Sequence, residues 1–193
     1  MKKKVFIFLF NGFSDWEISY LTPEVNKSNE YDLIYFSIES SPITSMGGLK
    51  VLPDISIKGL DINEVEMLIL PGGEAWEGDG NDHIDTIVQS LFAKGKTIAA
   101  ICAATTYLGK KGILDEVKHT SNDPDYLKSI ASAYKGGNNY INTSAIADQN
   151  IITANGTAPI EFTREVFRKL NLYNESDIET WYQLFKNGAW DKS

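Results

Sequence analysis

A solitary cysteine is the residue of this sequence best suited to covalent chemistry. Cys102 follows the apolar run 97–101 and precedes the small residues Ala103 and Ala104. A buried strand that brings a nucleophile to a tight turn, with a helix starting at once, is the geometry of a nucleophile elbow. A helix N-terminus beside the sulfur favours the thiolate, so the segment predicts a thiol pKa below its ordinary value. The alternative is a structural cysteine, because free cysteine is among the most buried residue types.

Two glycines follow another apolar run, 65–70, directly after Pro71. In a parallel sheet, ligands bind beyond the carboxyl ends of the strands. Glycine N–H groups can approach a bound oxygen closely, so the amides of Gly72 and Gly73 with that of Ala103 predict an oxyanion hole. The alternative interpretation of the glycine pair is an ordinary tight turn.

One carboxyl group, that of Glu17, follows the first strand after a short loop. Ser14 and Glu17 have the spacing of a capping box, in which Glu17 would only cap Ser14. In the other interpretation, Glu17 contacts the Cys102 sulfur and sets its protonation, since a buried carboxyl can stay protonated and donate to a thiolate. The spacing leaves both open.

Short apolar runs alternate with helical patterns along the whole chain, which is typical of a doubly wound α/β domain. We therefore expect one domain over residues 1–193, a three-layer α/β/α sandwich with a mainly parallel sheet. Pro23 is expected to kink or end the first helix. The expected strands are 4–10, 32–38, 65–70, 96–101, a short one at 117–121, and the pair 140–147 and 151–154, with a small hairpin over 43–52. The expected later helices are 82–94, 103–110, 124–132, 159–170 and 176–186.

Composition and charge narrow the function classes. The chain has 193 residues, of which 42% are hydrophobic, and a net charge of −8. That charge argues against nucleic acid or an anionic membrane as a partner. One cysteine and two separated histidines form no metal-ligand cluster, so no metal is expected. The apolar start is too short for a secretory leader, and we expect a cytoplasmic protein without a bound cofactor.

Five motifs in order resemble the ThiJ/PfpI superfamily, also called the DJ-one superfamily, within the class I glutamine amidotransferase-like fold. The resemblance covers 4 to about 170 and is carried by Gly12-Phe13-x-Asp15-Trp16-Glu17, Leu68-Ile69-Leu70-Pro71-Gly72-Gly73, Ala99-Ala100-Ile101-Cys102-Ala103-Ala104, Lys118-His119-Thr120-Ser121-Asn122, and Ile151-Ile152-Thr153-Ala154-Asn155-Gly156-x-Ala158-Pro159-x-Glu161-Phe162. It implies a flavodoxin-like sandwich and commonly a homodimer. It also implies a nucleophile at Cys102, a glutamate at Glu17, and an oxyanion hole from the amides of Gly73 and Ala103.

The sequence departs from the superfamily in its histidines. Many members carry a histidine near the cysteine, where this chain has Ala103 or Asn122. Asn122 would orient a substrate or polarise a carbonyl, or else be a turn residue. We expect His83 on the surface, and His119, three positions before Asn122, on the strand face away from the sulfur.

These features predict a cysteine-dependent hydrolase, either a peptidase or amidase or an aldehyde-detoxifying enzyme, acting on a small molecule or a peptide. Cys102 is the expected nucleophile and Glu17 the acid, base or pKa tuner. The alternative is a stress-response or redox-sensing protein in which Cys102 is oxidised. We expect Trp76 either to line the mouth of the pocket or to pack within the protein. The C-terminal tail that contains Trp190 is expected either to form a dimer contact or to be frayed at its end.

Overall fold

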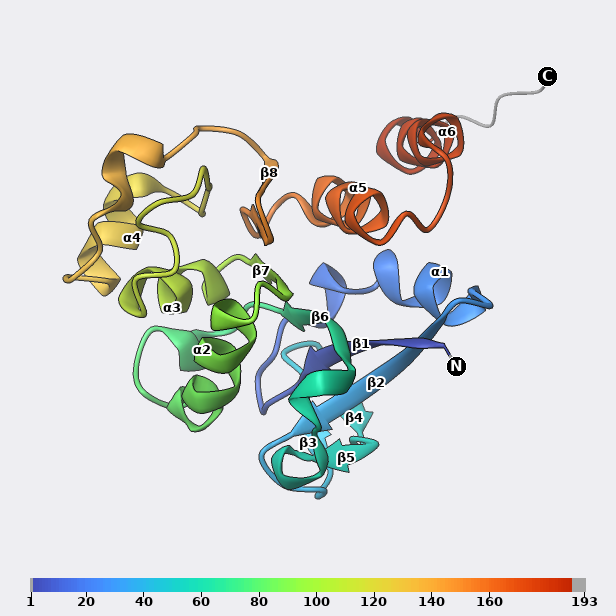
Figure 1. Ribbon diagram of the computed structural model, residues 1–193, viewed down its shortest axis with the longest axis horizontal. Coiled ribbons are helices and arrows are strands. Elements are labelled where there is room, and N and C mark those ends of the chain that lie inside the picture. Colours follow the sequence, from blue (N-terminus) through green and yellow to red (C-terminus); the bar gives the residue numbers. More distant parts are fainter. Residues whose placement is uncertain (1, 189–193) are drawn as a thin grey trace.

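A seven-stranded sheet runs through the centre of the computed structural model, which describes residues 2–188 (Figure 1). Trp190 lies outside the described residues. The strand order is β5-β2-β1-β6-β7-β9-β8, and β8 is antiparallel to β9 while the other neighbours are parallel. The strands are β1 (Lys3–Phe8), β2 (Tyr31–Ser37), β5 (Ile55–Ser56), β6 (Val65–Leu70), β7 (Thr97–Ile101), β8 (Ala145–Asp148) and β9 (Ile151–Ala154). A separate antiparallel pair, β3 (Ile43–Thr44) and β4 (Lys50–Val51), is the predicted hairpin.

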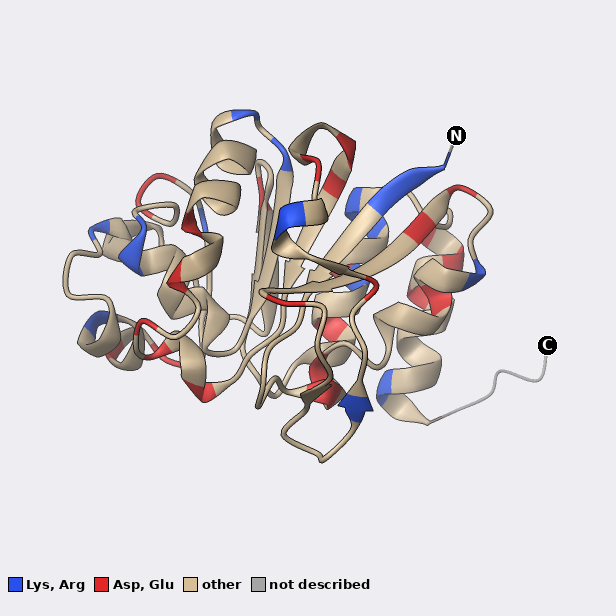
Figure 2. Cartoon of the chain, turned by 90° about the horizontal axis from the view of Figure 1, so that it is seen from below, with Lys and Arg blue, Asp and Glu red and all other residues tan. Residues whose placement is uncertain are grey.

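Helices cover both faces of this sheet, which confirms the predicted α/β sandwich. On one face lie α1 (Leu21–Lys27), α5 (Pro159–Leu170) and α6 (Glu175–Asn187), with α6 packed on α5 (Figure 1). On the other lie α2 (Asp85–Ala93) and α3 (Ala104–Lys110), and α4 (Pro124–Ile130) packs on α3. Lys and Arg are interspersed with Asp and Glu in the view of Figure 2, without a continuous basic stripe.

The central strands are apolar on both sides because helices cover both. Every residue of β7 is buried, and so are the last four of β1. Strands buried on both faces read as continuous apolar runs instead of alternating ones. This explains why the runs predicted the core of the sheet correctly.

The differences from the sequence-based prediction lie mostly at the ends of elements and in short segments. The chain after β1 forms a single 3₁₀ turn, η1 (Asp15–Glu17), and Pro23 lies in the first turn of α1, where a proline costs no hydrogen bond. The expected strand 117–121 is reduced to one bridge between His119 and Tyr140. β8 covers only the second half of the expected 140–147, and the two-residue β5 was missed because it is too short to form a pattern.

Candidate active site

The carboxyl ends of β1, β6, β7 and β9 meet at one edge of the sheet. The segments that leave these ends carry Glu17, Gly72, Cys102 and Gly156. Parallel pairing of β1 with β6, β6 with β7, and β7 with β9 brings these four distant segments to one place. This is the edge at which α/β folds bind ligands.

Cys102 occupies a tight turn between β7 and α3. Its φ of +61° lies in the left-handed region, which costs a non-glycine residue roughly 1–2 kcal/mol. The conformation is held from both sides, because the Cys102 N–H donates to the Ala154 carbonyl at 3.0 Å and the Cys102 carbonyl accepts from the Thr105 N–H at 3.1 Å. The residue is half-buried and packs against the core. The backbone therefore has the geometry expected for an elbow.

Glu17 is fully buried and turns toward this sulfur. Its Oε2 accepts from the Gly72 N–H at 2.6 Å, and its Oε1 is buried without a hydrogen-bond partner among the described residues. The capping-box interpretation is wrong, because the N–H of Ser14 donates to the Gly72 carbonyl and not to Glu17. Burial raises the pKa of Glu17 to about 7, although the Gly72 N–H and the nearby Cys102 and Ser14 side chains lower it in part. A carboxyl in this range can both accept and release a proton at neutral pH.

The thiol is not the preformed thiolate that the sequence predicted. Burial and then the negative charge of Glu17 raise the pKa of Cys102 to about 11, and they outweigh the lowering by Asn122 and the Ala103 amide. The seven-residue α3 begins beside the sulfur. The dipole of this helix stabilises a thiolate by less than the free energy that burial of the charged sulfur costs. The site therefore holds a neutral thiol beside a carboxyl that can take its proton.

Two glycines allow these groups to come together. A Cβ on Gly72 would lie 2.7 Å from both the Cys102 Cβ and the Glu17 Oε2, and a Cβ on Gly156 would lie 2.7 Å from the Cys102 sulfur. Real Cβ atoms do not approach other atoms so closely. Gly156 was missed as a site residue, although it lies in the fifth motif of the resemblance and directly after β9.

Asn122 reaches the sulfur with its side-chain amide. Its Nδ2 donates to the Cys102 Sγ at 3.4 Å, and its Oδ1 accepts from the Gly156 N–H at 2.8 Å. The second bond fixes which end of the amide faces the sulfur. Asn122 is thus placed in the site, where the sequence had left a turn residue as the alternative.

The two residues expected to supply the oxyanion hole follow β6 and β7, at the same edge of the sheet as Cys102. Gly73 has φ +146°, and a Cβ there would meet the Gly12 carbonyl at 2.7 Å, so only glycine fits. The Ala103 amide lies close enough to the sulfur to lower the thiol pKa. Lys110 steadies the loop after Gly73, because its ammonium donates to the carbonyls of Trp76, Glu77 and Gly78 at 3.0, 2.9 and 2.9 Å. The role of these amides remains a prediction.

Both histidines lie away from the sulfur, as expected. His83 is exposed. His119 is fully buried, with Nδ1 against the Val117 carbonyl and Nε2 against the Tyr134 hydroxyl. Burial lowers the pKa of His119, so the ring is neutral at pH 7.

An open cavity of roughly 330 Å³ gives access to the sulfur. It is lined by Trp16, Glu17, Cys102, Asn122, Asn155, Gly156 and Thr157. Trp76 is not among them. The expectation that it lies at the pocket mouth is wrong, because its ring is 1% exposed, packs on Phe8, Phe10 and Tyr107, and donates to the Pro71 carbonyl.

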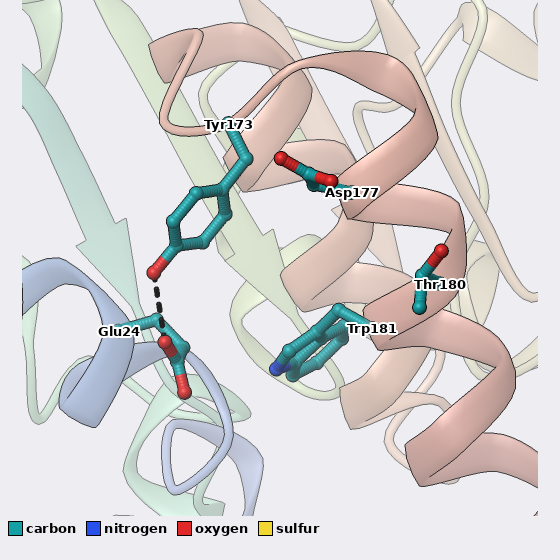
Figure 3. Close-up of a pocket in the computed structure, with 5 residues that line it drawn as sticks. All are labelled: Glu24, Tyr173, Asp177, Thr180 and Trp181. Atoms are coloured by element: carbon teal, nitrogen blue, oxygen red, sulfur yellow. Dashed lines mark hydrogen bonds between the residues drawn. The ribbon is translucent and has the colours of Figure 1, made fainter. Parts of the chain in front are cut away.

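A second hollow lies between α1 and α6 and is lined by no cysteine (Figure 3). Its two carboxyl groups already have partners. Glu24 pairs with Lys27 at 2.9 Å and accepts from the Tyr173 hydroxyl at 2.8 Å, and Asp177 accepts from the Asn174 amide. No group of three or more His, Cys, Asp or Glu side chains within residues 2–188 could hold a metal ion. In the same residues no helix has the length and apolar character needed to cross a bilayer.

The model of the DJ-1/PfpI family matches residues 3–169 of this chain. The chain belongs to the DJ-1/PfpI family. It is 37% identical over 191 residues to YoaZ of Bacillus subtilis, which is named as an uncharacterized protease, and the match covers 95% of this chain and 91% of YoaZ. It is 28% identical over 152 residues to the deglycase TK1284 of Thermococcus kodakarensis, which covers 78% of this chain and 89% of the relative.

A solved DJ-1/PfpI structure agrees with this fold closely. The crystal structure of the ThiJ/PfpI family protein from Bacillus anthracis has a TM-score of 0.90 and 38% identity, and covers 98% of this chain and 92% of that one. The resemblance drawn from the five motifs is therefore confirmed, together with the fold class. The names of the DJ-1/PfpI relatives indicate hydrolase-like or DJ-1-type functions at the level of the family.

Proposed function

We propose that this protein is a cysteine-dependent enzyme that detoxifies small reactive carbonyl compounds, with Cys102 as nucleophile and Glu17 as proton carrier. The observation that carries the proposal is the pairing of a neutral thiol with a buried carboxyl whose pKa is raised to about 7. A base with a pKa near the working pH is best suited to accept a proton during attack and to return it afterwards.

The first step needs only these two side chains. The Cys102 sulfur bonds to the carbonyl carbon of an aldehyde, and the thiol proton passes to the Glu17 carboxylate. The carbonyl π pair moves to the oxygen, which then takes the proton from Glu17 and becomes the hydroxyl of a hemithioacetal. The amides of Gly73 and Ala103 are the candidate donors to the developing oxyanion.

A substrate with a second carbonyl beside the aldehyde can complete the reaction without an external oxidant. In net terms, the hydrogen on the hemithioacetal carbon moves with its bonding electron pair to the neighbouring ketone carbon, and the proton of the hemithioacetal hydroxyl passes to the ketone oxygen. The first carbon is thereby oxidised and the second reduced by one electron pair. The product is a thioester, and water cleaves it to a 2-hydroxy acid and the free thiol. A 1,2-dicarbonyl such as methylglyoxal is thus the simplest substrate of this class.

Amide hydrolysis is less well supported. A departing amine needs a proton, and among the cavity-lining residues only Glu17 and Cys102 titrate. The redox-sensor alternative is weakened by the thiol itself, since oxidation follows the thiolate fraction and a pKa of about 11 keeps that fraction small. The name of the deglycase relative supports carbonyl chemistry, and the name of the protease relative supports the amide alternative.

The test is turnover of methylglyoxal, followed by product formation, in the wild type and in Cys102→Ala and Glu17→Gln. We expect loss of turnover in Cys102→Ala and a fall of about 10²- to 10⁴-fold in Glu17→Gln, the range of a general acid or base. Cleavage of a peptide amide in the absence of dicarbonyl turnover would replace the proposal by the peptidase. Addition of oxygen to Cys102 under mild peroxide, without any turnover, would replace it by the redox sensor.

A further inference from the structure

Trp16 is a large aromatic residue presented beside the nucleophile. It is 44% exposed and lines the cavity that contains Cys102. Trp76 and Trp181 each pack against other aromatic rings, whereas Trp16 takes part in no aromatic pair within residues 2–188. An unpaired indole next to a reactive atom is available to a ligand.

The position of Trp16 is set by its two neighbours in η1. Asp15 points to the hairpin, where its Oδ2 accepts from the Ser45 hydroxyl at 2.6 Å, and its Oδ1 accepts from the Trp16 N–H at 3.1 Å. Glu17 points inward to the Gly72 N–H. Because both neighbours are anchored in a single turn, the backbone of Trp16 is held in place, so a ligand that stacks on its ring orders only the indole side chain.

Asn155 and Thr157, which also line this cavity, are polar and uncharged. Asn155 Oδ1 accepts from both the N–H and the hydroxyl of Thr157, at 3.0 and 2.7 Å. No Lys, Arg or His side chain lines the cavity. An anionic substituent would therefore lose its water without gaining a counter-charge, and the ionised form of Glu17 would repel it.

We propose that Trp16 forms a subsite for the substituent of the carbonyl substrate, and that this substituent is planar and uncharged. It stacks on the indole while the carbonyl carbon lies against the Cys102 sulfur. The assignment deepens the proposed function, because it rests on Cys102 as the reacting group.

The experiment measures alkylation of Cys102, which needs no turnover. Because Cys102 is the only cysteine of the chain, the mass of the whole protein reports its modification without ambiguity. The reagents are iodoacetamide, N-phenyl iodoacetamide and iodoacetate, and each second-order rate is divided by the rate with N-acetylcysteine. The proteins are the wild type, Trp16→Ala, Trp16→Phe and the control Phe92→Ala, a 41% exposed aromatic on α2.

In the wild type we expect the phenyl reagent to be favoured over iodoacetamide by about tenfold, the scale of one aromatic contact. The preference should fall to about one to twofold in Trp16→Ala, and Trp16→Phe and Phe92→Ala should retain most of it. Iodoacetate should be the slowest of the three. A wild-type preference near one, an unchanged preference in Trp16→Ala, or fast reaction with iodoacetate would each overturn the subsite. A retained preference without methylglyoxal turnover would refute the proposed function and leave the subsite standing.

Discussion

Gly72 and Glu17 are joined by a 2.6 Å hydrogen bond from the glycine N–H to the carboxyl Oε2, between segments that follow β6 and β1. The bond holds the carboxyl in the core, where its second oxygen has no partner among the described residues. The absence of a Cβ at Gly72 leaves room for both Glu17 and Cys102. The raised pKa of Glu17 is thus a consequence of where the backbone places it.

Glu17 should make stability depend on pH. Its pKa rises from 4.5 to about 7 on folding, so the folded state binds more protons than the unfolded state between these values, and stability is lost as the pH rises through them. Glu17→Gln keeps an oxygen for the Gly72 N–H and removes the charge. It should gain about 2–4 kcal/mol over the wild type at pH 8 and gain nothing at pH 4, in urea unfolding.

Glu161→Gln is the matched control for that measurement. Glu161 is 6% exposed, and its ion pair with Lys186 helps to lower its pKa. The ionised Glu161 side chain stabilises the fold at pH values above its ordinary pKa, and this stabilisation is lost as the pH falls through its lowered pKa in the folded state. Glu161→Gln should therefore destabilise the protein at pH 8. Equal responses of the two variants would contradict the account of Glu17.

The two neighbours of the sulfur should shift its reactivity in opposite directions. Asn122→Ala removes a donor and should raise the thiol pKa further, slowing alkylation at pH 8 several-fold. Glu17→Gln removes a negative charge and should lower the thiol pKa from about 11, speeding alkylation. The measurement is the iodoacetamide rate from pH 6 to 11. An unchanged rate in both variants would show that burial alone controls the thiol pKa, and a change of the same sign in both would contradict the roles assigned to Glu17 and Asn122.

The buried histidine should weaken the fold in acid. The pKa of His119 lies below its ordinary value, so the unfolded state binds a proton first, and stability falls as the pH drops below about 6.5. In His119→Gln the free energy of unfolding should change less steeply with pH between 6.5 and 5. His83→Gln, at the exposed histidine, serves as the control, and an equal effect there would exclude His119 as the cause.

Gly156→Ala should block the site with limited damage to the fold. The added methyl would lie 2.7 Å from the Cys102 sulfur, so we expect turnover and iodoacetamide labelling to fall at least about tenfold, with a stability loss of roughly 1–3 kcal/mol. Gly137→Ala is the control, since its Cβ would meet only the Lys128 Cε, at 3.9 Å. Unchanged labelling in Gly156→Ala would show that the sulfur is approached from another side.

The sequence predicted the sheet well because its central strands are buried on both faces. The run 65–70 coincides with β6, and the helix expected over 159–170 coincides with α5, where proline fixes the start. Segments whose structure depends on distant partners were predicted less well. The segment around His119 is held by side chains and a single bridge, which local patterns do not encode.

For the site, the sequence identified the reacting groups but not their electrostatics. Cys102, Glu17 and Asn122 are brought together, although only the structure shows that Glu17 bonds Gly72 instead of capping Ser14. The shift of the Cys102 thiol pKa was predicted in the wrong direction, because the prediction considered the helix dipole and not burial or the negative charge of Glu17. Trp76 was the only tryptophan predicted for the pocket, and Trp16, which lines the cavity, was not singled out. Spacing does not distinguish the two, since both follow strands at the same edge of the sheet.

Both edge strands of the sheet, β5 and β8, are short. β8 contributes four residues, so its edge exposes only a brief row of backbone donors and acceptors, and at the other edge β5 pairs with the last two residues of β2. A long exposed edge strand would present unpaired backbone groups to which a strand of another chain can bind, and such pairing can start a fibril. We expect the short edge at β8 and the mutual repulsion that follows from a net charge of −8 to disfavour edge-to-edge aggregation of this protein at high concentration.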